Sequence, residues 1–135
     1  MKRRILLGYQ LLTGLSDGAT GILLIVAPSF TLNLMGIQVP SQSLPFVSFT
    51  GVFVLSVGLA CLYGAHLVRG RIDVARLEVV WLLTAVSRGL VALFVASRIL
   101  SGALAPAWVS VAVSDGSFAL VQMLGLYQGW LTDAI

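Results

Sequence analysis

The chain has 135 residues, of which 59% are hydrophobic and only 10% are charged, with a formal net charge of +3. Soluble domains carry about 25% charged residues, so this composition indicates an integral membrane protein and excludes an ordinary soluble domain. The mean hydropathy of +1.03 agrees with that assignment. The basic excess is small and lies mostly beside apolar segments, which is typical of membrane topology and not of nucleic-acid binding.

The chain opens with Met1-Lys2-Arg3-Arg4 and an apolar run that extends from Ile5 to Ala27. This run is longer than the roughly 7–15-residue apolar region of a signal peptide, and it contains Asp17. We therefore interpret it as a retained first membrane span.

Four apolar runs are long enough to cross about 30 Å of hydrocarbon, which takes roughly 20 helical residues. They cover about residues 5–27, 46–68, 77–100 and 107–130. Pro28, Pro45 and Pro106 lie at their boundaries, where proline is tolerated. We predict one all-α integral membrane domain over residues 1–135, a four-helix transmembrane bundle.

The placement of basic residues predicts the orientation of the bundle. Basic side chains precede the first span and fill the loop between the second and third, whereas residues 28–45 carry no charge. The basic residues of these two segments are Lys2, Arg3, Arg4, Arg69, Arg71 and Arg76. The positive-inside rule then places both termini in the cytoplasm, and we expect a multi-pass protein of a bacterial inner (plasma) membrane.

Two local features of the connections and span ends are also predictable. In the uncharged loop, Ser29 is a candidate cap and Gly36 a candidate end for a short interfacial helix. An ordered loop without a helix is equally consistent with this segment. Aromatic residues near the span ends are typical of an interfacial belt. They are Trp108 on the outer side and Trp81, Tyr127 and Trp130 on the inner side.

Three ionisable residues, Asp17, Arg88 and Asp115, interrupt the apolar runs. At 1.5 Å per residue, each lies roughly 18–20 Å from the cytoplasmic end of its span. A charge at such a depth costs about 2.5–3.5 kcal/mol on insertion scales, so it needs a partner or a function. The planar fork of an arginine can bridge two carboxylates, and we predict an intramembrane cluster of these three residues.

Polar and small residues flank the predicted cluster. Nearby polar side chains could satisfy the remaining lone pairs of the cluster; they are Ser16, Thr84, Ser87, Ser114 and Gln122. Small residues lie near the middle of each span and allow close helix packing. They are Gly14, Gly18, Gly21, Gly58, Ala85, Gly89, Ala112 and Gly116.

Two interpretations of the charged cluster remain open on the sequence. Two carboxylates and one guanidinium leave a net charge of −1, so one aspartate could hold a proton or the site could bind a cation. The cluster is then either an ion-pair pin that fixes the helix register or a proton- or cation-coupled transport site. Elsewhere, we expect His66 and Glu78 to pair at the inner interface and Cys61 to be a small core residue.

No motif in the sequence indicates catalysis or a cofactor. We find no phosphate loop, no dinucleotide fingerprint and no nucleophile–base arrangement. One cysteine and one histidine cannot build a multi-ligand metal site within the chain. We therefore expect no cofactor, no metal and no enzymatic activity.

Short motifs resemble those of the DoxX-like group of small four-helix bacterial membrane proteins. The first span is glycine-rich and ends in Ala27-Pro28, a short stretch closes at Leu34-Met35-Gly36, and the second span opens at Phe49-Thr50-Gly51. The resemblance implies an integral membrane protein, and some members of that group are subunits of quinone-linked redox complexes. It transfers no catalytic residue to this chain.

The sequence thus favours a non-catalytic subunit packed against a larger membrane complex, respiratory or otherwise redox-active. One alternative is a small transporter that uses Asp17 or Asp115 to carry a proton or cation. A second alternative is a membrane enzyme acting on lipid or quinone. We expect contacts with the lipid bilayer and with other membrane subunits or a second copy, and none with nucleic acid.

Overall fold

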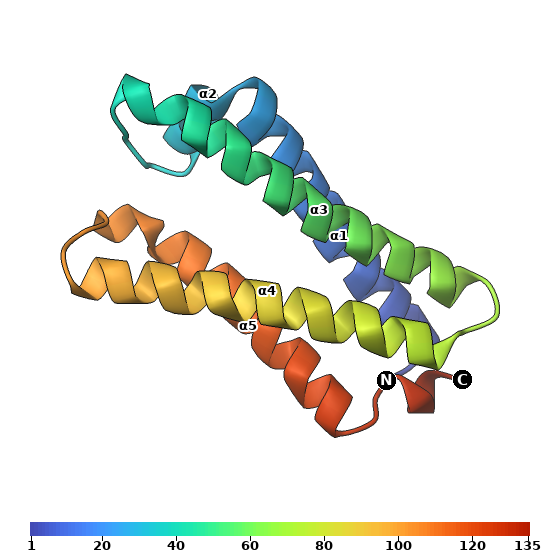
Figure 1. Cartoon of the computed structure of the whole chain (residues 1–135). Coiled ribbons are helices and arrows are strands. Elements are labelled where there is room, and N and C mark those ends of the chain that lie inside the picture. Colours follow the sequence, from blue (N-terminus) through green and yellow to red (C-terminus); the bar gives the residue numbers. More distant parts are fainter.

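The computed structural model describes all 135 residues and contains only helices, turns and loops (Figure 1). Four of the helices have the length and the apolar composition needed to cross a membrane. This confirms the predicted all-α, multi-pass architecture. The long helices are α1 (Arg3–Val26), α3 (Leu44–Arg69), α4 (Val74–Leu100) and α5 (Val109–Tyr127). The short elements are α2 (Pro28–Leu34) and the 3-10 turns η1 (Ser41–Ser43), η2 (Pro106–Trp108) and η3 (Thr132–Ala134).

Local signals explain where the long helices differ from the predicted spans. α4 begins three residues earlier than expected because the Asp73 side chain caps it, accepting a hydrogen bond from the Arg76 backbone N–H at 3.1 Å. α5 ends three residues earlier than expected because the chain turns at Gly129, where φ is +70°. A left-handed glycine after the last turn is a common helix terminator.

α2 follows α1 directly and lies at the end of the bundle opposite the termini (Figure 1). Its first residue is Pro28, whose fixed φ suits the start of a helix. Ser29 therefore lies inside the helix and makes no side-chain cap, so the predicted capping role was wrong. The predicted end at Gly36 is confirmed: φ is +71° there, and the Ile37 N–H bonds to the Leu32 carbonyl at 2.9 Å.

The long helices form two antiparallel hairpins, α1 with α3 and α4 with α5, and both chain termini lie at one end (Figure 1). In the first hairpin the backbones themselves touch. A Cβ added at Gly58 would lie 2.5 Å from the Gly18 backbone nitrogen, and one added at Gly21 would lie 2.5 Å from the Leu55 nitrogen. Only glycine permits this approach, because such a Cβ would overlap backbone that cannot move aside.

The second hairpin packs less closely. A Cβ added at Gly116 would lie 3.5 Å from the Ala92 Cβ, and one added at Gly89 would lie 3.9 Å from the Ala119 Cβ. These are ordinary van der Waals distances. The small residues of α4 and α5 therefore leave room between the helices for larger side chains, whereas those of α1 and α3 do not.

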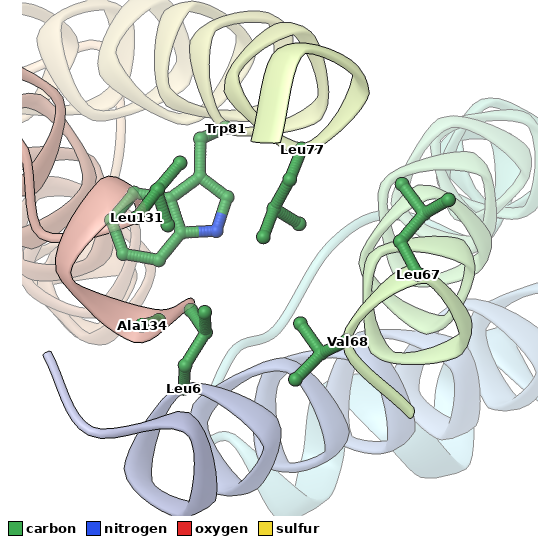
Figure 2. Packing of buried hydrophobic residues seen from close by; sticks show 7 residues of the cluster. All are labelled: Leu6, Leu67, Val68, Leu77, Trp81, Leu131 and Ala134. Atoms are coloured by element: carbon green, nitrogen blue, oxygen red, sulfur yellow. The ribbon is translucent and has the colours of Figure 1, made fainter. Parts of the chain in front are cut away.

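A buried apolar cluster joins both hairpins at the end that carries the termini (Figure 2). Its members come from α1, α3, α4 and the segment after α5, and they are Leu6, Leu67, Val68, Leu77, Trp81, Leu131 and Ala134. Trp81 is fully buried in this cluster, so its predicted place in an interfacial belt was wrong. It lies on the same helix face as the buried Leu77 and Thr84, which turns its ring inward.

Hydrogen bonds join the N-terminal residues Met1 and Arg3 to neighbouring segments at the same end of the bundle. The N-terminal ammonium donates to the Trp130 carbonyl at 3.0 Å. The Arg3 guanidinium donates to the carbonyls of Val68 and Arg69 at the end of α3, and to that of Gly70 just beyond it, at 2.7–3.0 Å. These bonds satisfy backbone acceptors that a helix end leaves free.

The glycine contacts generate a first prediction. Gly58→Ala should destabilise the protein by about 1–3 kcal/mol, because the added methyl group meets the α1 backbone and the two helices must separate. The free energy of unfolding, measured by titrating SDS into mixed micelles, tests this expectation. Gly116→Ala is the matched control, and it should be neutral. Equal stabilities of the two variants would contradict the close contact of α1 and α3.

Candidate functional site: an intramembrane charge cluster

Arg88 lies at the centre of the bundle and binds carboxylates from two other helices. Its Nη1 donates to Asp115 Oδ1 of α5 at 3.1 Å, and its Nη2 donates to Asp17 Oδ2 of α1. The three side chains thus meet as the sequence predicted, and they link the first hairpin to the second. One guanidinium fork serves both contacts, which lysine could not do with the same geometry.

Packing around the guanidinium removes it from lipid. Only 3% of the Arg88 side chain is exposed. Its central carbon lies 4.9 Å from the centre of the Phe118 ring, a cation–π contact. Cys61 of α3 is fully buried and lies beside the guanidinium, in agreement with its predicted place in the core. All four long helices therefore contribute to the surroundings of Arg88.

The two carboxylates are less enclosed than the arginine. Their side chains are 17% exposed for Asp17 and 23% for Asp115. Each uses one oxygen to accept a hydrogen bond from Arg88, and the second oxygen accepts none from the protein. With all three groups ionised, the cluster carries a formal charge of −1 that no further protein cation neutralises. The unused oxygens could bind a proton or a cation.

Of the five predicted supporting polar residues, none bonds to the cluster. Ser16, Ser87 and Ser114 are exposed, and the last two donate to carbonyls of their own helices at 2.9 and 3.2 Å. Each serine directly precedes a charged residue, so it lies about 100° around the helix from it and points outward. This part of the prediction was wrong.

Thr84 and Gln122 instead bond to each other inside the second hairpin. The Gln122 amide donates to Thr84 Oγ1 at 2.7 Å, and Thr84 donates to the Val80 carbonyl at 2.7 Å. Both side chains are buried. They hold α4 against α5 on the side of the cluster nearer the termini.

The predicted small residues divide between the two hairpins. Gly14, Gly18, Gly21 and Gly58 line the close contact of α1 with α3, where a Cβ added at Gly14 would lie 2.8 Å from Leu62 side-chain atoms. Ala85 of α4 is buried next to the cluster, with Gly89, Ala112 and Gly116 half-buried around it. The second group gives the Arg88 side chain the space to reach two helices.

The predicted pair of His66 and Glu78 does not form, because both side chains are exposed and no ion pair joins them. Their neighbours Leu67 and Leu77 take the inward positions at these helix ends. A residue next to an inward one points away from the bundle, and here both polar side chains do so.

Sequence reasoning missed three buried polar residues, Gln10, Thr13 and Thr31. The two threonines donate to backbone carbonyls four residues earlier, at 2.9 and 2.8 Å. Gln10 of α1 is fully buried, and its amide lies against Gly64 of α3. Gln10 lies seven residues before Asp17 and therefore on the same helix face, and this spacing could have predicted that it points into the bundle. No group of three histidine, cysteine or acidic residues is arranged to hold a metal ion.

Comparisons with known proteins add no assignment, since no family model, no curated protein and no solved structure matches the chain.

The cluster generates a second prediction. Arg88→Met should destabilise the protein by about 3–5 kcal/mol, because two carboxylates then lie inside the bundle without a counter-charge. SDS titration in mixed micelles measures this loss. Arg98→Met is the control, since Arg98 is exposed and lies over the Phe94 ring of its own helix, and it should change stability little.

A neutral cluster separates the effect of charge from the effect of packing. Asp17→Asn and Asp115→Asn added to Arg88→Met should restore most of the lost stability, because no buried charge remains unpaired. If the triple variant is as unstable as Arg88→Met alone, the ion pairs are not what holds the two hairpins together.

Proposed function

We propose that this chain is a non-catalytic membrane subunit that packs through α5 against other transmembrane segments of a larger membrane complex. The observation that carries this proposal is the outward face of α5. Ser110, Ser114 and Ser117 are exposed there at intervals of four and three residues, so they form one stripe along the helix. Small and hydroxyl residues are typical of contacts between membrane helices.

The neighbouring helices expose hydroxyl residues only at isolated positions, Thr50 and Ser56 on α3 and Ser87 and Ser97 on α4. α3 exposes mainly large apolar side chains, among them Phe46, Phe49, Phe53 and Leu59. α4 does the same with residues that include Leu82, Leu83, Leu90 and Leu93. α5 also exposes large apolar residues, among them Val113, Leu120 and Tyr127, which suit acyl chains. Its stripe of three serines is the part of its surface that suits another helix.

The charge cluster also supports a structural role. Arg88 is enclosed and shared between two aspartates of the same chain, so its main effect is to hold α1, α4 and α5 together. The resemblance to DoxX-like proteins favours a bacterial inner membrane and a redox complex as the setting. The basic residues near the N-terminus and in the α3–α4 loop lie at one end of the bundle, which favours a cytoplasmic location for that end (Figure 1).

Purification under mild conditions tests this function. A tagged copy extracted in mild detergent should migrate in a complex that contains additional, larger polypeptides. Ser114→Leu combined with Ser117→Leu should release those polypeptides, because the added side chains separate the helices that meet there. Ser87→Leu is the matched control on the exposed face of α4, and it should leave the complex intact.

Two outcomes would contradict this proposal. One is a monodisperse particle that contains only this chain. The other is an assembly that the α5 double variant and the α4 control affect equally. Far-UV circular dichroism of each variant establishes that the helices themselves remain folded.

A second candidate function is proton- or cation-coupled transport, and the excess acidic charge of the cluster favours it. Asp17 and Asp115 are partly exposed and each keeps one oxygen without a protein donor, so either could take up a proton or cation. This candidate differs from the first because it requires no other polypeptide.

Flux measurements distinguish the two candidates. If the chain is a transporter, purified protein in liposomes should show pH-dependent flux that Asp115→Asn abolishes, because asparagine accepts the Arg88 hydrogen bond but cannot exchange a proton. Asp133→Asn, at the exposed C-terminal end, should leave the flux unchanged. Absence of flux in the unmodified protein would eliminate this candidate.

A further inference from the structure

A second layer of buried polar side chains lies on the terminal side of the charge cluster. Each of the three helices that form the cluster carries one such residue seven positions nearer the end with the termini. These are Gln10 on α1, Trp81 on α4 and Gln122 on α5, each fully buried. Seven residues are about two turns, or roughly 10 Å, so all three lie on the cluster's own helix faces. We call this set the polar layer.

Most polar atoms of this layer have no hydrogen-bond partner in the protein. Both amide atoms of Gln10, the indole nitrogen of Trp81 and the carbonyl oxygen of Gln122 are without one. Only the Gln122 amide nitrogen has a partner, Thr84. The remaining set contains two donor groups and two acceptors. A buried polar group that makes no hydrogen bond is strongly disfavoured, so this set requires a ligand that both donates and accepts.

Gln10 and Trp81 lie near one shared residue, Leu77. The Gln10 amide and the Leu77 methyl group both border Gly64, where a Cβ would lie 3.3 Å from Leu77 Cδ1. In Figure 2 the nitrogen of the Trp81 indole lies on the side of the ring that is nearer Leu77. Leu77 is thus a shared neighbour of the Gln10 amide and the indole N–H. A Cβ at Gly125 would lie 2.5 Å from the Trp81 ring, so glycine gives the indole its space there.

On the other side of the charge cluster, no buried side chain has a polar atom without a hydrogen-bond partner. The positions seven residues from Asp17, Arg88 and Asp115, in the direction away from the termini, are Leu24 on α1, Val95 on α4 and Trp108 on η2. Leu24 and Val95 are buried, and Trp108 packs on the apolar cluster of Leu24, Leu32 and Ile37. Toward the termini, the polar layer adjoins the apolar cluster of Figure 2, and Trp81 belongs to both sets.

We propose that the polar layer is an internal hydration site, in which Gln10, Trp81 and Gln122 hold water between the apolar cluster of Figure 2 and the Asp17–Arg88–Asp115 cluster. Water donates and accepts, as these four atoms require, and a buried water commonly makes about three hydrogen bonds. Water at this site would hydrate the charge cluster from the side that faces the chain termini. This inference goes beyond the proposed function and does not rest on it.

Hydroxyl-radical labelling of the complete chain in lipid nanodiscs tests the proposal, with water itself as the probe. Radiolysis of bound water oxidises the side chains beside it, so Trp81 should be modified at a rate comparable to that of the half-exposed Trp108, although Trp81 is fully buried. Gln10→Leu should lower the labelling of Trp81 several-fold. Gln42→Leu, an exposed control at the opposite end, should not.

Two results would overturn the proposal. If Trp81 in the unmodified protein is not labelled, the layer is dry, and its side chains pair directly with one another. If Trp81 is labelled equally in Gln10→Leu, the water reaches it through opening of the helix ends and is not held by the polar layer. The first result requires no variant, so the proposal stays testable even if Gln10→Leu does not fold.

Discussion

A single buried guanidinium holds the two halves of this protein together. Arg88 reaches Asp115 within its own hairpin and Asp17 in the other one, and only 3% of its side chain is exposed. In hydrocarbon, where an unpaired charge is strongly disfavoured, the lowest-energy arrangement is the one that keeps these groups in contact. The relative position of the hairpins, the contact of Phe118 with the guanidinium and the apolar cluster of Figure 2 that joins the hairpins are all consistent with that one constraint.

The two hairpins reach their own stability by different means. α1 and α3 touch through glycine, and backbone meets backbone at Gly18 and Gly58. α4 and α5 stand further apart and fill the space between them with Arg88 and with the Thr84–Gln122 hydrogen bond. The first hairpin is thus held by close packing and the second by polar side chains. In lipid both are effective, since association there depends on packing and hydrogen bonds and not on the exclusion of water.

The sequence correctly predicted the features that depend on the length of an apolar run and on the depth of a residue within its span. The four spans follow from apolar runs, and the meeting of Asp17, Arg88 and Asp115 follows from a rise of 1.5 Å per residue. Predictions that required the direction of a side chain failed. Ser87 and Ser114 point outward and Trp81 points inward, and only the positions of the neighbouring helices decide this. The predicted pairing of His66 with Glu78 failed for a related reason: side chains near the interface can bind solvent in place of each other, and the sequence does not show which they do.

Asp17 and Arg88 are separated by 71 residues in the sequence, which has a consequence for biosynthesis. At translation rates of about 5–20 residues per second, the ribosome needs roughly 4–14 s to add that length of chain. During this interval the first hairpin can already close through its glycines, while its carboxylate has no cation of this chain to bind. The nascent chain therefore passes through an intermediate in which Asp17 must be protonated, hydrated or shielded by the insertion machinery until the third crossing arrives.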